Sequence, residues 1–539
     1  MRAWLRTIVA ALCGWLCLSI ACAHAAALSP DPTGMWYDPA NPGWGLSVTQ
    51  QGETIFAALF VYDANHKPVW YVASKVIDSG THLDPIGSEV FTGALFRTTG
   101  PWLGNATFDP NAVTVTPVGN LGLARGVTAG TLLVSYSIDA LSVSTSVQPQ
   151  IWASAAPRLF GGYYGGVFLS SGTCEVPVLN GRLAQFGIGQ GEVPGHMFLT
   201  WGTGIDTGCI LDGTFAQSDQ TGTLSGPFSC GPIGGNLSST STLTLSEIVF
   251  GAGGFSAAAK LQTPQCTFTG NAGGALSPNA TPIAGSMHPD PTGMWFDSAA
   301  PGYGLSLTQQ GANIFGVLFA YGTDNKAQWL VASNVVDAGQ GAFAGPLYRT
   351  LGPAAGAGGD TTAFSVTNVG SLKLRYGPGA SPFGANLVVD YTVDGTTVER
   401  ILQRETWSGT NLTGTYTGGL ALAGSGVSGC DALSNAGSGG TITITQSQGS
   451  MQIAWQPDTG TQCSVSGGSS PFGNLATFSG SGQCISNTTP ATISAFSIAE
   501  MSVTPHGFSG TLAYTAQPSF AGGTCNYTGT IGGVRRQLQ

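Results

Sequence analysis

Residues 31–52 read Asp-Pro-Thr-Gly-Met-Trp-Tyr-Asp-Pro-Ala-Asn-Pro-Gly-Trp-Gly-Leu-Ser-Val-Thr-Gln-Gln-Gly, and residues 290–311 read Asp-Pro-Thr-Gly-Met-Trp-Phe-Asp-Ser-Ala-Ala-Pro-Gly-Tyr-Gly-Leu-Ser-Leu-Thr-Gln-Gln-Gly. A near-repeat of this length indicates an internally duplicated chain. The two copies also allow an internal comparison, because a catalytic or metal constellation that the module needs should occur in both. An accident of one copy need not recur in the other.

The segment after each repeat has the pattern of strands and turns. Thr54–Tyr62 is an apolar run that ends in turn residues, and a second run over residues 69–74 follows, which is typical of a β-hairpin. The second copy repeats this hairpin over residues 313–333. Further short apolar runs follow without a helical period. Sequential strands without long crossovers favour a meander that closes as an up-and-down barrel.

Apolar residues of Thr54–Tyr62 fall on both faces of the expected strand. Ile55 and Leu59 lie on one face, and Phe56 and Phe60 lie on the other. Only one face of a barrel strand meets the core, so the other face must be covered by a neighbouring module, a partner or a ligand. We expect a neighbouring module of the same half to cover it, which predicts module–module packing within each half.

The chain is therefore expected to be all-β, with four antiparallel up-and-down β-barrel-like domains in two tandem pairs, the second of each pair stapled by disulfides. A segment rich in proline and small residues joins the two halves. The expected parts are a tryptophan module at 28–156, a cysteine module at 158–275, a linker at 276–289, a second tryptophan module at 287–409 and a second cysteine module at 411–536.

The N-terminus has the pattern of a secretory signal peptide over residues 1–25. A basic n-region precedes an apolar stretch that is too short to span a membrane, and Ala23-His24-Ala25 resembles a cleavage site. We therefore expect a periplasmic, extracellular or outer-surface protein, without a transmembrane segment after cleavage. Lipidation at Cys22, in a loose lipobox-like context, is the alternative.

Composition points to the same compartment. Charged residues make up only 8% of the chain, and the formal net charge of −10 leaves no basic footprint for nucleic acid or anionic lipid. Removal of the leader leaves eight of the eleven cysteines, an even number that favours disulfides in an exported chain.

The eight remaining cysteines fall in the two cysteine modules, four in each, so that three pairings per module are open. The equal separation of 21 residues in both modules, across turn-like sequence, favours Cys209–Cys230 and Cys463–Cys484. These choices leave Cys174–Cys266 and Cys430–Cys525. No C-x-x-C or Cys–His spacing indicates a metal site, and no cofactor is expected.

Gly34-Met35-Trp36 and Gly293-Met294-Trp295 resemble the G-x-W motif that opens the first strand of lipocalins and their avidin relatives. The resemblance implies a barrel in which the tryptophan packs against an arginine from the last strand. Arg404 fits that role in the second copy, whereas Pro149 occupies the aligned position of the first copy.

The resemblance does not extend to biotin. Asp38 and Asp297 stand where avidins use an asparagine, and an ionised carboxylate cannot donate a hydrogen bond to the ligand. The wider pattern G-x-W-[YF]-D…P-G-x-G…T-Q-Q-G also resembles repeat modules of exported proteobacterial proteins, a likeness that implies no function.

No catalytic constellation is retained by both copies. No histidine has a counterpart in the other copy, and no nucleophile-elbow, zinc-protease or P-loop motif occurs. Asp31 and Asp38 are close enough in sequence for a carboxylate pair, but each lies in an Asp-Pro-type turn context, which favours a structural role. We expect a non-enzymatic protein with no catalytic and no metal-binding residues.

The candidate binding residues are Trp44, Gln50, Tyr303 and Gln309. The glutamines are expected at an exposed hairpin tip, where amides bind sugar hydroxyls while aromatic faces stack on sugar rings. The alternative is that Trp44 and Tyr303 merely cover the barrel ends.

Two classes of function follow from these patterns. The first is a binding protein that takes a small apolar ligand inside the barrels or a glycan at their rims. The alternative is a structural or adhesive cell-surface or matrix protein in which filled barrels are spacers. A hydrolase is the less favoured third possibility, because the copies keep no nucleophile and base together.

Overall fold

The computed structural model describes residues 27–536 apart from 84–86, 103, 105–107, 154–158, 172–182, 191–194, 203–206, 219, 233–237, 277–284, 358–363, 378–385, 410, 427–437, 458–460, 487–488 and 519–522. The described residues form antiparallel strands and one short 3-10 turn, η1 (Pro110–Ala112). The expected all-β class is confirmed.

The tryptophan modules fold as barrels 1 and 3. Barrel 1 contains β1 (Gly34–Tyr37), β2 (Gly45–Gln51), β3 (Thr54–Tyr62), β4 (Pro68–Leu83), β5 (Ser88–Thr99), β6 (Thr114–Arg125), β7 (Leu132–Ile138) and β8 (Leu141–Pro149). Barrel 3 contains β17 (Gly293–Phe296), β18 (Gly304–Gln310), β19 (Asn313–Tyr321), β20 (Ala327–Gly339), β21 (Ala342–Leu351), β22 (Ser365–Tyr376), β23 (Leu387–Val393) and β24 (Thr396–Arg404).

The cysteine modules form barrels 2 and 4. Barrel 2 contains β9 (Leu159–Ser171), β10 (Leu183–Gln190), β11 (His196–Gly202), β12 (Thr207–Ser218), β13 (Thr221–Pro232), β14 (Ser238–Gly251), β15 (Gly254–Gln262) and β16 (Thr267–Leu276). Barrel 4 contains β25 (Gly414–Gly426), β26 (Ser438–Ser447), β27 (Ser450–Pro457), β28 (Thr461–Phe472), β29 (Leu475–Ser486), β30 (Thr489–Thr504), β31 (Gly507–Pro518) and β32 (Cys525–Arg535).

Each sheet is a meander in which every strand pairs with the next one along the chain and the last strand returns to the first. In barrel 1 the closing pair is short, with Trp36 opposite Pro149 and Tyr37 opposite Gln148. In barrel 3 Trp295 lies opposite Arg404. The antiparallel up-and-down barrel predicted from the sequential short strands is the observed architecture.

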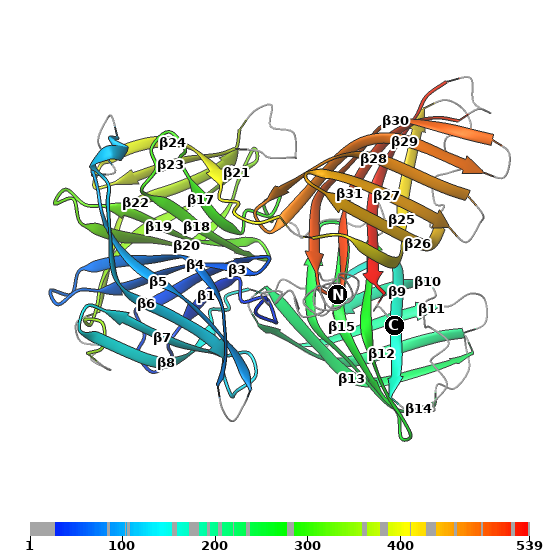
Figure 1. Ribbon diagram of the computed structural model, residues 1–539, viewed down its shortest axis with the longest axis horizontal. Coiled ribbons are helices and arrows are strands. Elements are labelled where there is room, and N and C mark those ends of the chain that lie inside the picture. The colour runs from blue at the N-terminus through cyan, green and yellow to red at the C-terminus, as the bar shows by residue number, and fades with distance from the viewer. Residues whose placement is uncertain are drawn as a thin grey trace, which may run out of the picture.

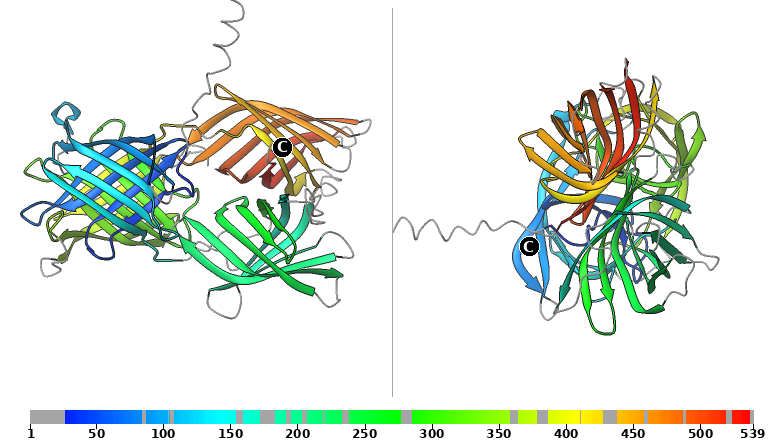
Figure 2. Two further views of the ribbon diagram at one scale, coloured as in Figure 1. Left: turned by 60° about the horizontal axis from the view of Figure 1, so that its bottom comes forward. Right: turned by 90° about the vertical axis from the view of Figure 1, so that its right-hand side faces the viewer.

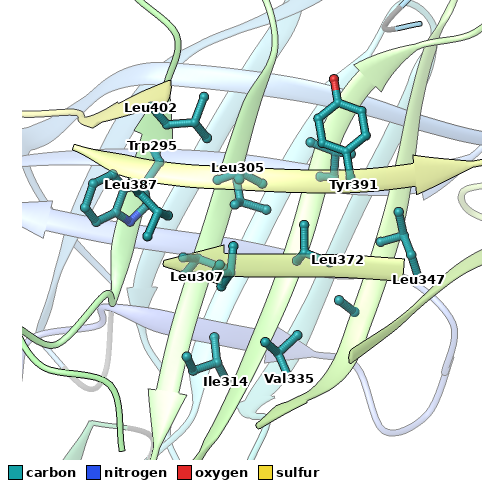
Figure 3. Close-up of a cluster of buried hydrophobic side chains, with 14 of the residues drawn as sticks. Trp295, Leu305, Leu307, Ile314, Val335, Leu347, Leu372, Leu387, Tyr391 and Leu402 are labelled. Carbon is teal, nitrogen blue, oxygen red and sulfur yellow. The ribbon is translucent and has the colours of Figure 1, made fainter. Parts of the chain in front are cut away.

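Inward-facing apolar side chains fill the barrels. Alternating burial along β7 shows the period of two that a barrel strand requires, because successive side chains point to opposite faces. Figure 3 shows the core of barrel 3, where large side chains from all sides converge. Its labelled members are Trp295, Leu305, Leu307, Ile314, Val335, Leu347, Leu372, Leu387, Tyr391 and Leu402.

The main contacts join barrels of different halves, so the expectation that a module of the same half covers the outer face of β3 is wrong. Packing within a half occurs in the second half, where Phe472 of barrel 4 packs on Trp295 of barrel 3. Barrels 1 and 3 lie against each other, and barrels 2 and 4 form the second pair (Figure 1; a second view in Figure 2). The outer faces of β3 and β4 meet those of β19 and β20 in one buried cluster that includes Phe60, Trp70, Phe319 and Trp329. The two-faced apolar strand found in the sequence is thus covered by its own second copy.

The contact between barrels 1 and 3 is reciprocal. Trp70 Nε1 donates to the Ala320 carbonyl at 3.1 Å, and the equivalent Trp329 Nε1 donates to the Val61 carbonyl at 3.0 Å. Where the two surfaces cross, the hydroxyls of Ser47 and its counterpart Ser306 are 2.6 Å apart. Such isologous contacts are those of a two-fold dimer, here contained within one chain.

Glycine brings barrels 2 and 4 into close contact. Strand β16 lies along β32, and a Cβ built on Gly532 would lie only 3.2 Å from the Ala275 backbone nitrogen. Polar bonds accompany this approach, among them Asn271 Nδ2 donating to the Arg535 carbonyl at 3.0 Å. A side chain larger than hydrogen at Gly532 would push the two barrels apart.

The disulfides Cys209–Cys230 and Cys463–Cys484 are both present, and each joins directly opposed residues of neighbouring strands. These are the two pairs that the equal spacing favours. Cys266 and Cys525 are also disulfide-bonded. The partners proposed for them from the sequence, Cys174 and Cys430, lie outside the described residues.

Candidate functional site

One cavity lies where all four barrels meet, not inside any one of them. It has a volume of about 450 Å³ and is lined by residues of every barrel. Volumes of this size are typical of small-molecule sites. Its charged lining comprises Asp31, Glu247, His288, Asp290, Arg404, Glu500, His506 and Arg535.

Barrels 1, 3 and 4 share one capping arrangement at the end that faces the cavity. Trp36 Nε1 donates to the Pro32 carbonyl at 2.8 Å, and Trp295 Nε1 donates to the Pro291 carbonyl at the same distance. In barrel 4 a tyrosine takes the place of the tryptophan, and Tyr416 Oη donates to the Leu412 carbonyl at 2.7 Å. We call this end of each barrel the capped end.

Glutamine side chains complete the caps. Gln50 uses its amide to bind both the backbone nitrogen and the carbonyl of Leu28, and Gln309 binds Met287 in the same way. In barrel 4 Gln446 accepts from the Leu412 nitrogen at 3.1 Å. The tryptophan modules and the second cysteine module, which look unlike in sequence, therefore share one capped barrel design.

Arg404 occupies the position that the lipocalin-like resemblance implies. Its guanidinium lies 4.7 Å from the ring centre of Trp295 and 4.4 Å from that of Phe472, which reaches in from barrel 4. It donates to the carbonyls of Thr292, at 2.7 Å, and of Asp290. Burial lowers the pKa of Arg404, while nearby Tyr376 and Asp290 oppose the change.

Among the described residues, an arginine of the last strand caps barrels 3 and 4, both in the second half of the chain. Arg535 lies over Tyr416, with its Cζ 5.1 Å from the ring centre, as Arg404 lies over Trp295. The equivalent register positions of the first half hold Pro149 and Ala275. Barrel 1 instead places Arg125 at the end of β6, where its Nε donates to the Ser29 carbonyl at 3.2 Å. Burial lowers the pKa of Arg125 to about 10 despite the opposing charge of Asp31.

Asp31 and Asp290 form turns, as their sequence context predicts. Oδ1 of Asp31 accepts from the Thr33 nitrogen at 2.8 Å and from the Thr33 hydroxyl at 2.7 Å, and Asp290 bonds Thr292 in the same way. Asp31 keeps accessible surface toward the cavity. Because protein surrounds it, desolvation raises its pKa, an effect that the bonds from Thr33 only partly offset.

Asp38 lies at the other end of barrel 1 and is not part of the cavity. Its carboxylate accepts bonds from the Ala40 nitrogen, Asn41 Nδ2 and the Thr145 hydroxyl. Burial alone would raise its pKa, but these bonds to the ionised form lower it. The two aspartates considered as a carboxylate pair therefore occupy opposite ends of the barrel, and each serves a turn.

Barrels 2 and 4 each direct one glutamate to the cavity from an equivalent strand irregularity. Glu247 of β14 and Glu500 of β30 both have positive φ, 54° and 46°. Each glutamate lies within a register shift of its strand pair. Bulges often re-aim a side chain out of the regular pattern, and here they turn two carboxylates toward the junction of the barrels.

Two histidines lie against these glutamates. His506 Nε2 is 3.2 Å from Glu247 Oε2, and His288 Nδ1 is 3.7 Å from Glu500 Oε1. The bond and charge of His506, partly opposed by burial, lower the pKa of Glu247. Among the described residues no group of three or more His, Cys, Asp or Glu side chains could hold a metal ion.

Comparison with known proteins adds no name to this arrangement. No family model, no curated protein and no solved structure matches the chain. The function must therefore be argued from the site. Within the described residues, no helix is long and apolar enough to cross a membrane.

The sequence-based rim site is not assembled. Gln50 and Gln309 are buried in the caps instead of exposed at hairpin tips, because the carbonyls and amides of the preceding segments need partners there. Trp44 and Gln50 flank opposite ends of β2, which puts them about 20 Å apart at the rise of a strand. The glutamines line the cavity, while the aromatic residues do not.

Trp44 and Tyr303 cover the open ends of their barrels, which was the alternative interpretation of these residues. Trp44 packs edge-on against Tyr136, with ring centres 5.9 Å apart, and Tyr303 is buried under Phe108 of barrel 1 at 5.4 Å. The loops of barrels 1 and 3 cover one another's open ends, and the Ala355 nitrogen of barrel 3 donates to the Tyr62 carbonyl of barrel 1.

Arg97 and Arg349 occupy equivalent positions in the two copies. Each lies in the outer region of its barrel, away from the cavity. Arg97 pairs with Asp139 at 2.5 Å and Arg349 with Asp394 at 2.6 Å. Both aspartates occupy hairpin turns with positive φ. The charged residues that both copies keep are therefore turn and rim supports, and neither pair lies among the cavity residues.

Sequence reasoning missed Glu247, Glu500, His288 and His506 as site residues. A signal for the glutamates was present, because each precedes a buried phenylalanine by eight residues, Phe255 in one module and Phe508 in the other. The histidines leave no repeated signal, since each copy provides its histidine from a different position.

Proposed function

We propose that this protein is an exported, non-enzymatic binding protein whose ligand occupies the central cavity between the four barrels. One observation carries the proposal. The cavity has small-molecule size, and its polar lining converges from all four barrels. A protein that served only as a spacer would not need desolvated charges at that junction, because burying charge costs free energy.

The lining suits a small ligand that has both an apolar face and hydroxyl groups, such as a sugar. Carboxylates, arginines and amides of glutamine and asparagine line the cavity together with a larger apolar surface that includes Leu28 and Phe250. Such mixed groups accept and donate hydrogen bonds to hydroxyls. An apolar ligand inside a barrel has less support, because the interiors are occupied by clusters of buried side chains.

The alternative is a structural or adhesive surface protein. The filled interiors of the barrels support this alternative, because they leave no room for a ligand inside a barrel. Barrels 1 and 3 are capped at one end and covered by each other's loops at the other. On this alternative the central cavity holds only water. The disulfides suit an oxidising, exported location under either function.

Native mass spectrometry of the protein purified from its own secretion medium separates the two functions. We expect a co-purifying small molecule that an Ala252→Trp variant loses, because Ala252 lines the cavity and an indole would fill it. The matched control is Ala299→Trp, at an exposed turn. A wild-type protein that carries no small molecule, or one that Ala252→Trp retains, would contradict binding in this cavity.

A further inference from the structure

Two histidine–glutamate pairs connect different barrels across the cavity. His288 directly precedes barrel 3 and lies against Glu500 of barrel 4, whereas His506 of barrel 4 lies against Glu247 of barrel 2. Ser29, in the segment before β1, also donates to Glu247 Oε2 at 3.3 Å. The contacts of His288 and Ser29 link the pair of barrels 1 and 3 to the pair of barrels 2 and 4, whereas that of His506 lies within the second pair.

Glu500 depends on its histidine more than Glu247 does. Its side chain is 12% exposed, and its Oε1 is buried without a hydrogen-bond partner in the described structure. Glu247 has a hydrogen-bonding histidine, a serine hydroxyl and the charge of Arg125. A buried carboxylate oxygen without a hydrogen bond is stabilised by a nearby positive charge.

The groups that face His288 come from β30 and from the segment of His288 itself, before β17. Glu500 approaches from β30, Asp290 follows two residues later in its own segment, and Ser286 places its hydroxyl 2.8 Å from His288 Nε2. Arg404 and Tyr376 stand beyond Asp290. A protonated His288 together with Arg404 balances the two carboxylates, whereas a neutral His288 leaves one negative charge uncompensated.

We infer that the protonation of His288 controls the closure of the central cavity. The charged imidazole holds barrels 3 and 4 together through Glu500, and loss of its proton loosens that junction. The inference rests on the proposed function, because closure matters only if the cavity holds a ligand. It adds regulation to that site: retention while His288 is protonated and release once it has lost its proton.

The direction of the pH effect follows from the pKa of His288. Burial alone would lower it, but the contact with Glu500 and the charges of Glu500 and Asp290 raise it above 6.5. A raised pKa means that the junction is fully stabilised below about 6.5, the ordinary value for histidine, and that this stabilisation is lost as the pH rises through the higher folded-state value.

The contact between Glu247 and His506 responds to acid, because the pKa of Glu247 is lowered. The pKa of Glu247 is lowered, chiefly by the hydrogen bond from His506, so its contribution is present above the ordinary glutamate value of 4.5 and is lost as the pH falls through the lower folded-state value. A change at higher pH that follows His288 is therefore separable from an acid change at Glu247.

Hydrogen exchange of the full-length protein between pH 6 and 9, corrected for the intrinsic pH dependence of exchange, tests this inference. We expect protection of the β30 segment around Glu500 to fall over this range. Glu500→Gln should abolish the pH dependence, because the neutral amide needs no counter-charge. His288→Gln should show the loosened segment already at pH 6. His506→Gln is the matched control and should keep the alkaline change at β30.

Unchanged protection of β30 in the wild-type protein would overturn the inference, as would an undiminished alkaline loss in Glu500→Gln. The readout does not depend on a ligand. A co-purified small molecule in a protein whose β30 protection ignores pH would reject the switch and leave the binding function standing. A pH-sensitive junction in a protein without any ligand would support the switch and reject the binding function.

Discussion

A single buried guanidinium holds the capped end of barrel 3 together. Arg404 is 7% exposed, contacts two aromatic rings and donates to two backbone carbonyls. Arg349 of the same barrel is instead in a largely exposed ion pair with Asp394. The same residue type thus occupies two positions with very different energetic weight, because exposed pairs are screened by water.

Arg404→Ala should therefore destabilise barrel 3 by roughly 2 to 4 kcal/mol, since it removes charge-assisted hydrogen bonds and leaves buried carbonyls without partners. Arg349→Ala should cost at most about 1 kcal/mol. Native-state hydrogen exchange in β17–β24 measures both changes. Equal effects of the two substitutions would show that the cap contributes no more than a surface ion pair.

At this scale the sequence predicted backbone-determined roles and missed the charged contacts. The G-x-W motif located Trp36, Trp295 and Arg404 correctly, because local strand geometry and the closing register fix these positions. The exposure of Gln50 was wrong. Its neighbours are polar and turn-like in sequence, yet the segment before β1 folds back and its backbone groups take the amide.

Strands and hairpins were the most predictable elements. The hairpin expected from Thr54 onward forms as β3 and β4, with the turn at Asp63, whose side chain accepts from the nitrogens of Asn65 and Lys67. Strand β4 continues past the apolar run to Leu83. Its C-terminal half carries polar residues and is largely exposed to solvent. The period of two is weak in such a half-exposed strand, so its end was not evident.

The disulfides make barrels 2 and 4 sensitive to reductant, while barrels 1 and 3 contain no cysteine. Each bond with a separation of 21 residues should stabilise its barrel by roughly 3 kcal/mol in the loop-entropy account. Reduction should thus lower protection in β9–β16 and β25–β32 only. Non-reduced peptide mapping should also give Cys174–Cys266 and Cys430–Cys525. A Cys174–Cys430 link would contradict that pairing.

The arrangement of the whole molecule could not be read from one copy of the repeat. The sequence showed that β3 carries apolar residues on its outer face, but not which module covers them. Linear neighbours seemed the nearest candidates. The duplicated surface is instead complementary to itself, so that Trp70 and Trp329 each find a carbonyl on the opposite copy. Self-complementarity is a property of three-dimensional shape and leaves no periodic signal.

Barrels 1 and 3 should therefore respond together to damage at their contact. Trp70→Ala removes a buried indole that packs on Phe319 and Tyr321, and large core truncations of this kind cost about 3 to 5 kcal/mol. We expect faster hydrogen exchange in β19 and β20 as well as in β3 and β4. Trp70→Phe is the control and should lose only about 1 kcal/mol with the hydrogen bond. An effect confined to barrel 1 would show that the barrels are energetically independent.

Covalent linkage of the four barrels has a consequence for what the central cavity can discriminate. An assembly of four identical subunits surrounds its centre with identical walls, and an asymmetric guest then has several equivalent orientations. Here the walls have diverged: His288 stands where the first copy has Ser29, and Arg404 where it has Pro149. A single tethered chain can thus hold an asymmetric guest in one orientation, with a head end and a tail end.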